Sequence, residues 1–293
     1  PWDSSLQLNG NGQYVMCGEK SDFYFTNQLT VEAWIYPTDF KSAEHMNTIV
    51  SKTYWDPTSY GWTLRYGSSN GTLCFNMAGE GTSWINCMAD NALIQNTWQH
   101  VAATYNGSVI ALYVNGVQVA TQSHSGDIIN ATINNLCIGS THYADYRYMT
   151  GLIDEVRIWD IARSENEISA SLDHCDITDN LLAYYRMTDG TGSSLTDNSG
   201  HGYTGELVGG PSWNFTNLFD ANPIVKTEDV TPSGLYDATA EGHIYYLGHY
   251  DIIQHGHCWS IDPDRSFPIY PKSLLYSLRI PIPLIQVPRF NMI

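Results

Sequence analysis

Hydrophobic and polar residues alternate with a period of two through most of the first 215 residues. In residues 29–36, for example, Val31 and Ala33 alternate with Glu32 and Trp34. This alternation is typical of a strand with one face toward a core. Comparable runs occupy residues 61–66, 72–77, 98–105, 109–114 and 117–120. The pattern predicts an all-β protein made of many short strands.

Turn signals separate these runs at regular intervals. The Asn-Gly pairs at residues 106–107 and 115–116 favour tight hairpins. Strands divided by turns every 8–12 residues or so predict a two-sheet antiparallel sandwich. We expect one short helix at residues 165–172, because Ser164 can act as its N-cap and Glu167 can complete a capping box.

The character of the chain changes near residue 219. We assign the sandwich to residues 1–218, a linker to 219–228, a partial second β-domain to 229–264 and an irregular tail to 265–293. The tail contains five prolines and no glycine or acidic residue. Because proline cannot donate to a sheet ladder, this segment cannot form central strands. It is either a truncated or frame-shifted end, or an extended tail.

Composition narrows the possible functions. Hydrophobic residues make up 43% of the chain, which is enough for a sizeable core, and the net charge is −17. Nucleic-acid binding is therefore not expected, because a phosphate backbone needs lysine and arginine to replace its counterions. There is no run of 18 apolar residues, so we expect no membrane insertion.

The six cysteines have no Cys-X-X-Cys spacing, which argues against a zinc cluster. Cys74 and Cys87 flank a predicted hairpin tip and could face each other across the strands. A disulfide between them would fit an oxidising compartment. Two unpaired buried thiols are the alternative.

Several motifs, in the same order, resemble bacterial laminin-G-like (LamG-like) jelly rolls of the concanavalin A-like lectin/glucanase superfamily, which includes pentraxins. The most specific is Gly-Leu-Ile-Asp-Glu-Val-Arg-Ile-Trp at residues 151–159. The resemblance covers residues 4–215 and implies two antiparallel sheets packed face to face in a secreted or cell-surface protein. The other matching motifs are at residues 5–15, 30–35, 98–102, 162–168, 182–186 and 197–207.

A second, shorter resemblance follows the sandwich. Residues 236–244 and 254–260 resemble fibronectin-III-like modules of Bacteroidetes surface proteins. The downstream strands that such a module requires are missing from the sequence. Their absence supports a partial module at residues 229–264, and the resemblance itself implies a bacterial surface protein as the parent.

The resemblance also implies a structural calcium ion. Similar jelly rolls use the strand of Asp154 to anchor calcium against the N-terminal strand, so oxygens of Asn9 and Asn11 are the expected partners. The alternative is that Asp154 hydrogen-bonds the sheet edge or pairs with Arg157. Residues 197–200 form a second oxygen-rich loop, which is also explained as a turn held by the Asp197 side chain.

Carbohydrate recognition needs aromatic faces together with polar groups that orient hydroxyls. Two inter-strand loops and one hairpin offer both, although loop aromatics also serve as packing lids. The candidate binding residues are Tyr54, Trp55, Asp56 and Tyr60 in the first loop, Trp84 at the hairpin, and Tyr143, Asp145 and Tyr146 in the second loop.

Catalysis is not expected. The glucanases of this fold carry catalytic acids on one strand in a Glu-X-Asp-X-X-Glu pattern, which does not occur here. There is also no Gly-X-Ser-X-Gly motif and no phosphate-binding glycine loop. The sequence therefore predicts a non-catalytic extracellular module that binds carbohydrate or glycoprotein. The alternative is a structural or adhesive spacer that mediates protein–protein contact.

Overall fold

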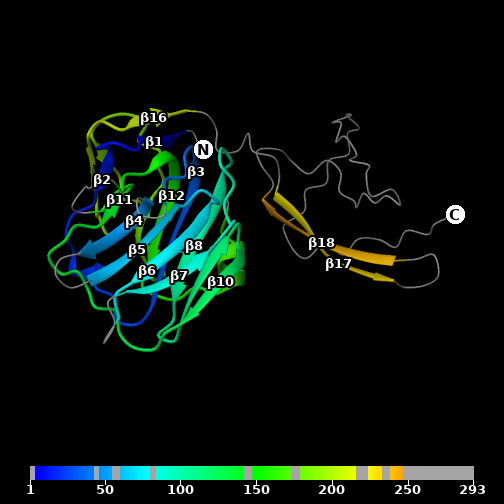
Figure 1. Cartoon of the computed structure of the whole chain (residues 1–293). Helices are drawn as coiled ribbons and strands as arrows, with labels where there is room; N and C mark the ends of the chain where they lie inside the picture. The colour runs from blue at the N-terminus through cyan, green and yellow to red at the C-terminus, as the bar shows by residue number, and fades with distance from the viewer. Residues whose placement is uncertain are drawn as a thin grey trace. The chain divides into compact units, whose positions relative to one another are not determined.

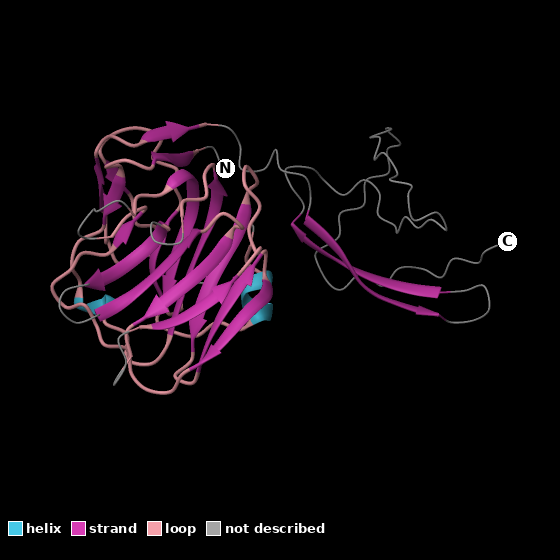
Figure 2. Ribbon diagram, in the orientation of Figure 1, coloured by secondary structure: helices cyan, strands magenta, loops and turns pink. Residues whose placement is uncertain are grey.

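Figure 1 shows the computed structural model of the whole chain. It describes residues 4–42, 46–54, 60–79, 84–141, 147–172, 179–215, 224–232 and 238–246, with the backbone alone for Tyr54 and the last two ranges. Strands dominate, and helical turns are limited to η1 (Ser21–Phe23) and α1 (Glu165–Ser169) in these ranges (Figure 2). The chain divides into two units at residues 218 and 219.

The first unit contains two eight-stranded antiparallel sheets, as the alternating pattern predicted. Sheet A has the strand order β10-β9-β8-β3-β12-β1-β16, and β13 also pairs with β12. Its strands are β1 (Ser5–Asn9), β3 (Leu29–Pro37), β8 (Gln99–Tyr105), β9 (Val109–Val114), β10 (Val117–Ser123), β12 (Thr150–Trp159), β13 (Leu181–Tyr185) and β16 (Ser212–Asn214).

Sheet B has the strand order β14-β15-β2-β11-β4-β5-β6-β7. Strands β4 to β7 follow one another in sequence and lie side by side (Figure 1). The strands of sheet B are β2 (Tyr14–Met16), β4 (Asn47–Tyr54), β5 (Tyr60–Gly67), β6 (Thr72–Met77), β7 (Ile85–Ala89), β11 (Cys137–Ile138), β14 (Ser194–Leu195) and β15 (Gly205–Val208).

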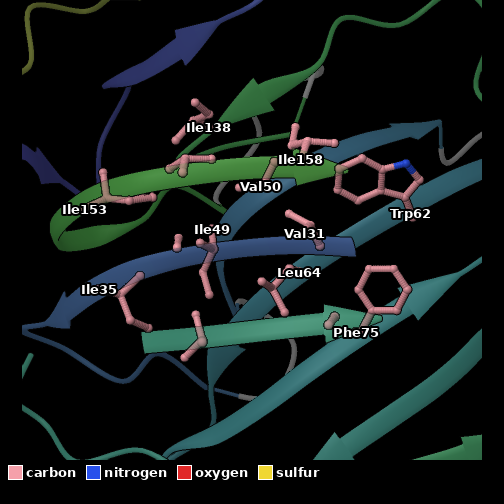
Figure 3. Close-up of a cluster of buried hydrophobic side chains, with 14 of the residues drawn as sticks. Val31, Ile35, Ile49, Val50, Trp62, Leu64, Phe75, Ile138, Ile153 and Ile158 are labelled. Carbon is pink, nitrogen blue, oxygen red and sulfur yellow. The ribbon is translucent and has the colours of Figure 1, made fainter. Parts of the chain in front are cut away.

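The hydrophobic core lies between the two sheets. Val31 and Ile35 of β3 and Ile153 of β12 project from sheet A, while Trp62 and Phe75 project from sheet B (Figure 3). All five side chains are buried. The inward-facing side chains of each sheet thus form one half of a shared core, and burial of this core holds the two sheets together.

One glycine is needed where the strands of sheet A approach closely. Gly151 begins the run of β12 opposite β3 and has φ of +140°. A Cβ atom at this position would lie 2.2 Å from the carbonyl oxygen of Tyr36. A side chain at residue 151 would therefore push β12 away from β3.

The predicted helix is present but shorter than expected. It spans Glu165–Ser169 and has the predicted capping box. The backbone N–H of Ser164 donates to the Glu167 carboxylate at 2.7 Å, and the Ser164 hydroxyl accepts from the Glu167 N–H at 3.4 Å. Ile168 is the buried residue of this helix and packs on the outer side of sheet A, which fixes one short turn in place.

The second unit contains one described hairpin, formed by β17 (Ile224–Pro232) and β18 (Ala238–Tyr246). The strand β17 begins inside the segment that we expected to be a linker, so residues 224–228 are strand. An isolated two-stranded hairpin is at most marginally stable in water. The predicted partial module and the predicted tail extend outside the described residues.

Candidate functional site

The two outward faces of the sandwich differ in what covers them. On sheet A, the segment 161–172 lies across the outer side chains of β3, β8 and β12. The Trp34 indole N–H donates to the carbonyl oxygen of Leu172 at 2.7 Å, and Arg157 donates to that of Ser171 at 2.8 Å. Trp34 and Arg157 are consequently buried. The part of this face formed by β3, β8 and β12 is therefore protein interior.

A buried charge cluster holds that covering segment. The Glu32 carboxylate accepts from the Arg163 guanidinium at 2.8 Å and from the Trp159 indole at 2.9 Å, with the His100 ring 3.4 Å away. Burial opposes ionisation of Glu32, but His100 and the two arginines (Arg157 and Arg163) outweigh it and lower its pKa to about 2. The side chains of this cluster interact with one another inside the protein, so we assign the cluster a structural role.

The outward face of sheet B is polar and is built from paired strands. Cross-strand register places Ser51 opposite Thr63, Thr63 opposite Asn76 and Asn76 opposite Asn86. The first three are buried, and Asn86 at the edge strand β7 is exposed. Most of their polar atoms already have partners within the sheet; for example, the Ser51 hydroxyl donates to the carbonyl oxygen of Ser140 at 2.8 Å.

The next row of the same face is the candidate site. Thr48 of β4 lies opposite Arg65 of β5, which lies opposite Cys74 of β6. The backbone N–H of Thr48 donates to the carbonyl oxygen of Arg147 at 3.1 Å, which brings the segment after β11 to this row. We call Tyr14, Thr48, Arg65, Thr141 and Tyr148 the Thr48 site.

Two tyrosines lie at one end of the Thr48 site. Tyr14 is on the outward face of β2, and its ring centroid lies 6.2 Å from that of Tyr148. Both rings are half-buried. Burial, together with the neighbouring Cys137, Tyr148 and Glu206, raises the pKa of Tyr14, so its hydroxyl is protonated at neutral pH. The pair can offer both ring surface and hydroxyl groups to a ligand.

Two hydroxyl groups of the Thr48 site are buried without a hydrogen-bond partner. Thr48 and Thr141 are at most 1% exposed, and neither Oγ1 atom has a hydrogen-bond partner among the residues that the structure describes. A buried hydroxyl without a partner is unfavourable by about 1–3 kcal/mol. Thr53, on the same face of β4, has a third such hydroxyl. These atoms mark where a polar ligand or a water molecule would be accommodated.

Some of the predicted sugar-binding residues lie beside the strands of sheet B, and the others lie outside the described residues. Tyr60 begins β5, and Trp84 immediately precedes β7; both are partly buried. The backbone of Tyr54 ends β4 opposite Tyr60. The other predicted residues, Trp55, Asp56, Tyr143, Asp145 and Tyr146, lie outside the described residues, although the last three fall between Thr141 and Arg147 of the sequence.

The expected calcium ligands are not brought together. The register of β1 and β12 pairs Asn9 with Thr150, four residues from Asp154. At roughly 3.3 Å per residue, Asn9 and Asp154 are about 13 Å apart, whereas oxygens that bind one calcium ion lie about 2.3–2.6 Å from it. Asn9 is exposed and accepts from the Asn11 N–H at 2.9 Å, while Asp154 is buried. These three residues do not fit a shared calcium site.

Asp154 and Asp197 have other roles. Asp154 accepts from the backbone N–H of Glu155 at 2.7 Å, and Arg157 pairs with Glu155 at 2.6 Å. Asp197 accepts from the backbone N–H groups of Tyr184, Ser199 and Tyr203, at 2.9–3.0 Å. The Asp197 loop is therefore a turn held by its side chain. Among the described residues, no group of three or more His, Cys, Asp or Glu could hold a metal ion.

Of the two alternatives for Cys74 and Cys87, the structure has the unpaired buried thiols and not the disulfide. Cys74 pairs with Met88 and Phe75 pairs with Cys87, so the two thiols lie on opposite faces of sheet B. Cys87 points into the core, and Cys74 belongs to the outer row. The four cysteines that the structure describes are all free and buried: Cys17, Cys74, Cys87 and Cys137.

A family model agrees with this architecture. Residues 9–169, more than half of the chain, match Laminin_G_3, the model of the concanavalin A-like lectin/glucanases superfamily. The chain belongs to this family. The match ends at the last residue of α1, so it takes in β2 to β12 and the covering helix, but not β13 to β16 or the second unit.

Curated relatives of this laminin-G-like chain include pappalysin-1 from two mammals. The Homo sapiens protein is 29% identical over 133 residues, which is 39% of this chain and 8% of that protein. The Mus musculus protein is 25% identical over 260 residues, covering 80% of this chain and 16% of that protein. The chain thus spans less than a fifth of the length of these relatives.

The fold is shared with a solved structure, and a second solved structure is more distantly similar. A proposed carbohydrate binding protein from Bacteroides ovatus has a TM-score of 0.59 at 22% identity, with 73% of this chain and 60% of that chain covered. A heptameric pentraxin from Limulus polyphemus has a TM-score of 0.46 at 18% identity, with 60% and 85% covered. In the described part of the chain, no helix is long and apolar enough to cross a membrane.

Proposed function

We propose that this chain is a non-catalytic extracellular module that binds carbohydrate or glycoprotein through the Thr48 site. The observation that carries the proposal is the Tyr14–Tyr148 ring pair beside the row of sheet B that contains Thr48, whose buried hydroxyl has no hydrogen-bond partner among the described residues. Aromatic rings can stack on the C–H faces of a sugar, and its hydroxyl groups can complete the unpaired threonines. This combination of groups matches a polyhydroxylated ligand.

The charges of the face support a binding role over a catalytic one. Glycoside hydrolysis requires two carboxyl groups on either side of the scissile bond. The rows that contain Ser51 and Thr48 carry one acidic residue in the described strands, Glu206 of β15. Arg65 belongs to the Thr48 site itself. A sugar held here would meet hydroxyls, a phenol pair and a guanidinium, without a facing pair of acids in the described residues.

A structural or adhesive spacer is the second candidate function. It is favoured by the burial of Ser51, Thr63 and Asn76, which leaves little of the outward face open beyond its rim. Ligand binding at Thr48 and Thr141 therefore requires local opening of the face. A spacer would not require the outward face of sheet B to open, because it would make its protein contacts elsewhere.

A glycan array tests the two candidates directly. The full chain is compared with Thr48→Val and Tyr148→Ala, with Thr121→Val as a matched control. Thr121 is exposed on β10 of sheet A, so its variant makes the same chemical change away from the site. We expect both site variants to lose at least tenfold in affinity and the control to bind as the native chain does.

Two outcomes would contradict the proposal. Full binding by Thr48→Val and Tyr148→Ala, with loss in Trp55→Ala, would move recognition to the loop at residues 54–60. No glycan bound by the folded chain, with or without added calcium, would favour the spacer. Circular dichroism of every variant separates loss of binding from loss of fold.

A further inference from the structure

Four asparagines in the first unit have the sequence Asn-X-Ser/Thr that accepts N-linked glycan, with X other than proline. Two of them lie in turns between strands, one lies in a segment where its amide donates two hydrogen bonds, and one lies within a strand. The four are Asn70, Asn106, Asn130 and Asn214. The structure separates them by what their side-chain amides already do.

Asn70 lies in the turn between β5 and β6 and is exposed. Its side-chain oxygen accepts from the hydroxyl of Thr72 at 2.9 Å, the residue that completes its motif. The Asn70 amide nitrogen makes no hydrogen bond in the described part of the chain. An added sugar would thus extend from a turn into solvent without displacing an existing contact.

Asn106 has the same arrangement in the turn between β8 and β9. It is exposed, and its side-chain oxygen accepts from the backbone N–H groups of Ser108 at 3.0 Å and Val109 at 2.8 Å. The turn therefore depends on the oxygen of the Asn106 amide. Within the described ranges its nitrogen has no partner, so a glycan on that nitrogen leaves the turn intact.

Asn130 differs because both of its amide hydrogens are used. The nitrogen donates to the carbonyl oxygens of Phe25 at 2.8 Å and Ile128 at 3.2 Å. A glycosylated amide retains one hydrogen, so one of these carbonyls would lose its donor. Asn214 lies within β16, opposite Ser5 of β1, and has a further interaction of its own. Glycosylation of Asn130 would thus cost a contact that is present in the fold.

We propose that Asn70 and Asn106 are N-glycosylation sites of this chain, and that Asn130 is not. The donor is a lipid-diphosphate-linked oligosaccharide, acted on by an oligosaccharyltransferase. The asparagine nitrogen bonds to the anomeric carbon as the bond from that carbon to the diphosphate oxygen breaks. The lipid diphosphate leaves with the electron pair, and one amide proton passes to a base of the transferase. The proposal requires export of the chain but not sugar binding at the Thr48 site.

The full chain, placed behind a secretion signal in a eukaryotic host, provides the test. Peptide mapping follows release with a glycosidase that converts glycosylated asparagine to aspartate. We expect this conversion at residues 70 and 106. Intact mass should fall by one glycan in Asn70→Gln and by one in Asn106→Gln, and should not change in Asn130→Gln.

The result that overturns the assignment is equally specific. Unmodified asparagine at residue 70 or 106 in the secreted, folded chain removes that site from the proposal. A glycan found at residue 130 in folded protein contradicts the geometric argument as a whole. Thr72→Ser keeps the Asn70 motif and must retain the glycan, whereas Thr72→Ala must lose it, which separates motif loss from misfolding.

Discussion

The guanidinium of Arg163 donates a 2.8 Å hydrogen bond to the carboxylate of Glu32, although the two residues are 131 positions apart in the chain. Glu32 is on the outward face of β3, and Arg163 lies in the segment that covers that face. The ion pair is thus made only when the covering segment has docked. The buried Glu32 carboxylate therefore gains Arg163 as its ion-pair partner when the covering segment packs on sheet A.

Removal of Arg163 should destabilise the sandwich strongly. In Arg163→Met the Glu32 carboxylate stays buried with a weaker set of partners, and breaking a buried pair in this way is unfavourable by about 3–5 kcal/mol. Urea unfolding of the full chain measures the change in free energy. The Glu32→Gln/Arg163→Met double variant should recover part of the loss, because no uncompensated charge remains. A loss below about 1 kcal/mol in Arg163→Met would show that the pair is not important for docking.

Asp154 should make the protein less stable at neutral pH than an asparagine would. Burial, followed by the nearby Glu155 charge, raises the pKa of Asp154 well above its usual 3.8. The folded state therefore keeps a proton that the unfolded chain has lost, and this contribution to stability falls as pH rises above about 4. Asp154→Asn cannot ionise, so it should melt at a higher temperature than the native chain at pH 7, with a smaller difference at pH 4.

Asp160→Asn is the matched control for this measurement, because Asp160 is exposed just after β12. It makes the same chemical change at a solvent-exposed position. If Asp154→Asn melted below the native chain at pH 7, and calcium raised the melting temperature of the native chain alone, a cation at Asp154 would explain both results. Calcium would then be held by a set of residues other than the one expected from the sequence.

The described cysteines should resist alkylation in the folded protein. Burial raises the pKa of Cys17 and of Cys87 to about 12, so almost no thiolate is present at pH 8. Iodoacetamide should label the two only after unfolding in urea, as read by peptide mass spectrometry. A disulfide-linked peptide containing Cys74 and Cys87 under non-reducing conditions would contradict the opposite-face geometry.

Thr48→Val should leave the protein as stable as the native chain or raise its free energy of unfolding by about 1 kcal/mol, because it removes a buried hydroxyl without a partner. Thr72→Val makes the same change at another buried position, where the hydroxyl bonds to Asn70 and Asp90. It should lower stability by about 1 kcal/mol. Equal losses in both variants would indicate that Thr48 has a partner in solution.

The parts of the fold that depend on local pattern were predicted from the sequence. The alternation in residues 29–36 matches β3, whose apolar side chains enter the core. The capping box at Ser164 is also present, because it depends on residues three positions apart. The helix ends at Ser169 and not at residue 172, because the following residues bond to sheet A instead of continuing the helix.

The candidate site was only partly predictable. Tyr14 and Thr48 come from β2 and β4, which are both neighbours of β11, and only the register of sheet B brings the two strands to the same face. No local motif contains these residues and Thr141, so the search for aromatic loops missed Tyr14 and both threonines. The separation of Asn9 from Asp154 could not be predicted for the same reason, since the offset of β1 against β12 cannot be read from either strand alone.

The pairing of β1 with β16 has a mechanical consequence. Ser5 lies opposite Asn214, so the first and last strands of the sandwich are antiparallel neighbours whose outer ends meet. A stretching load applied at these two ends would peel β16 from β1 one residue pair at a time, instead of shearing all pairs at once. The remaining contact of β1 with β12 would still carry load after β16 had detached. Under tension, the sandwich would therefore lengthen slightly before its core opens.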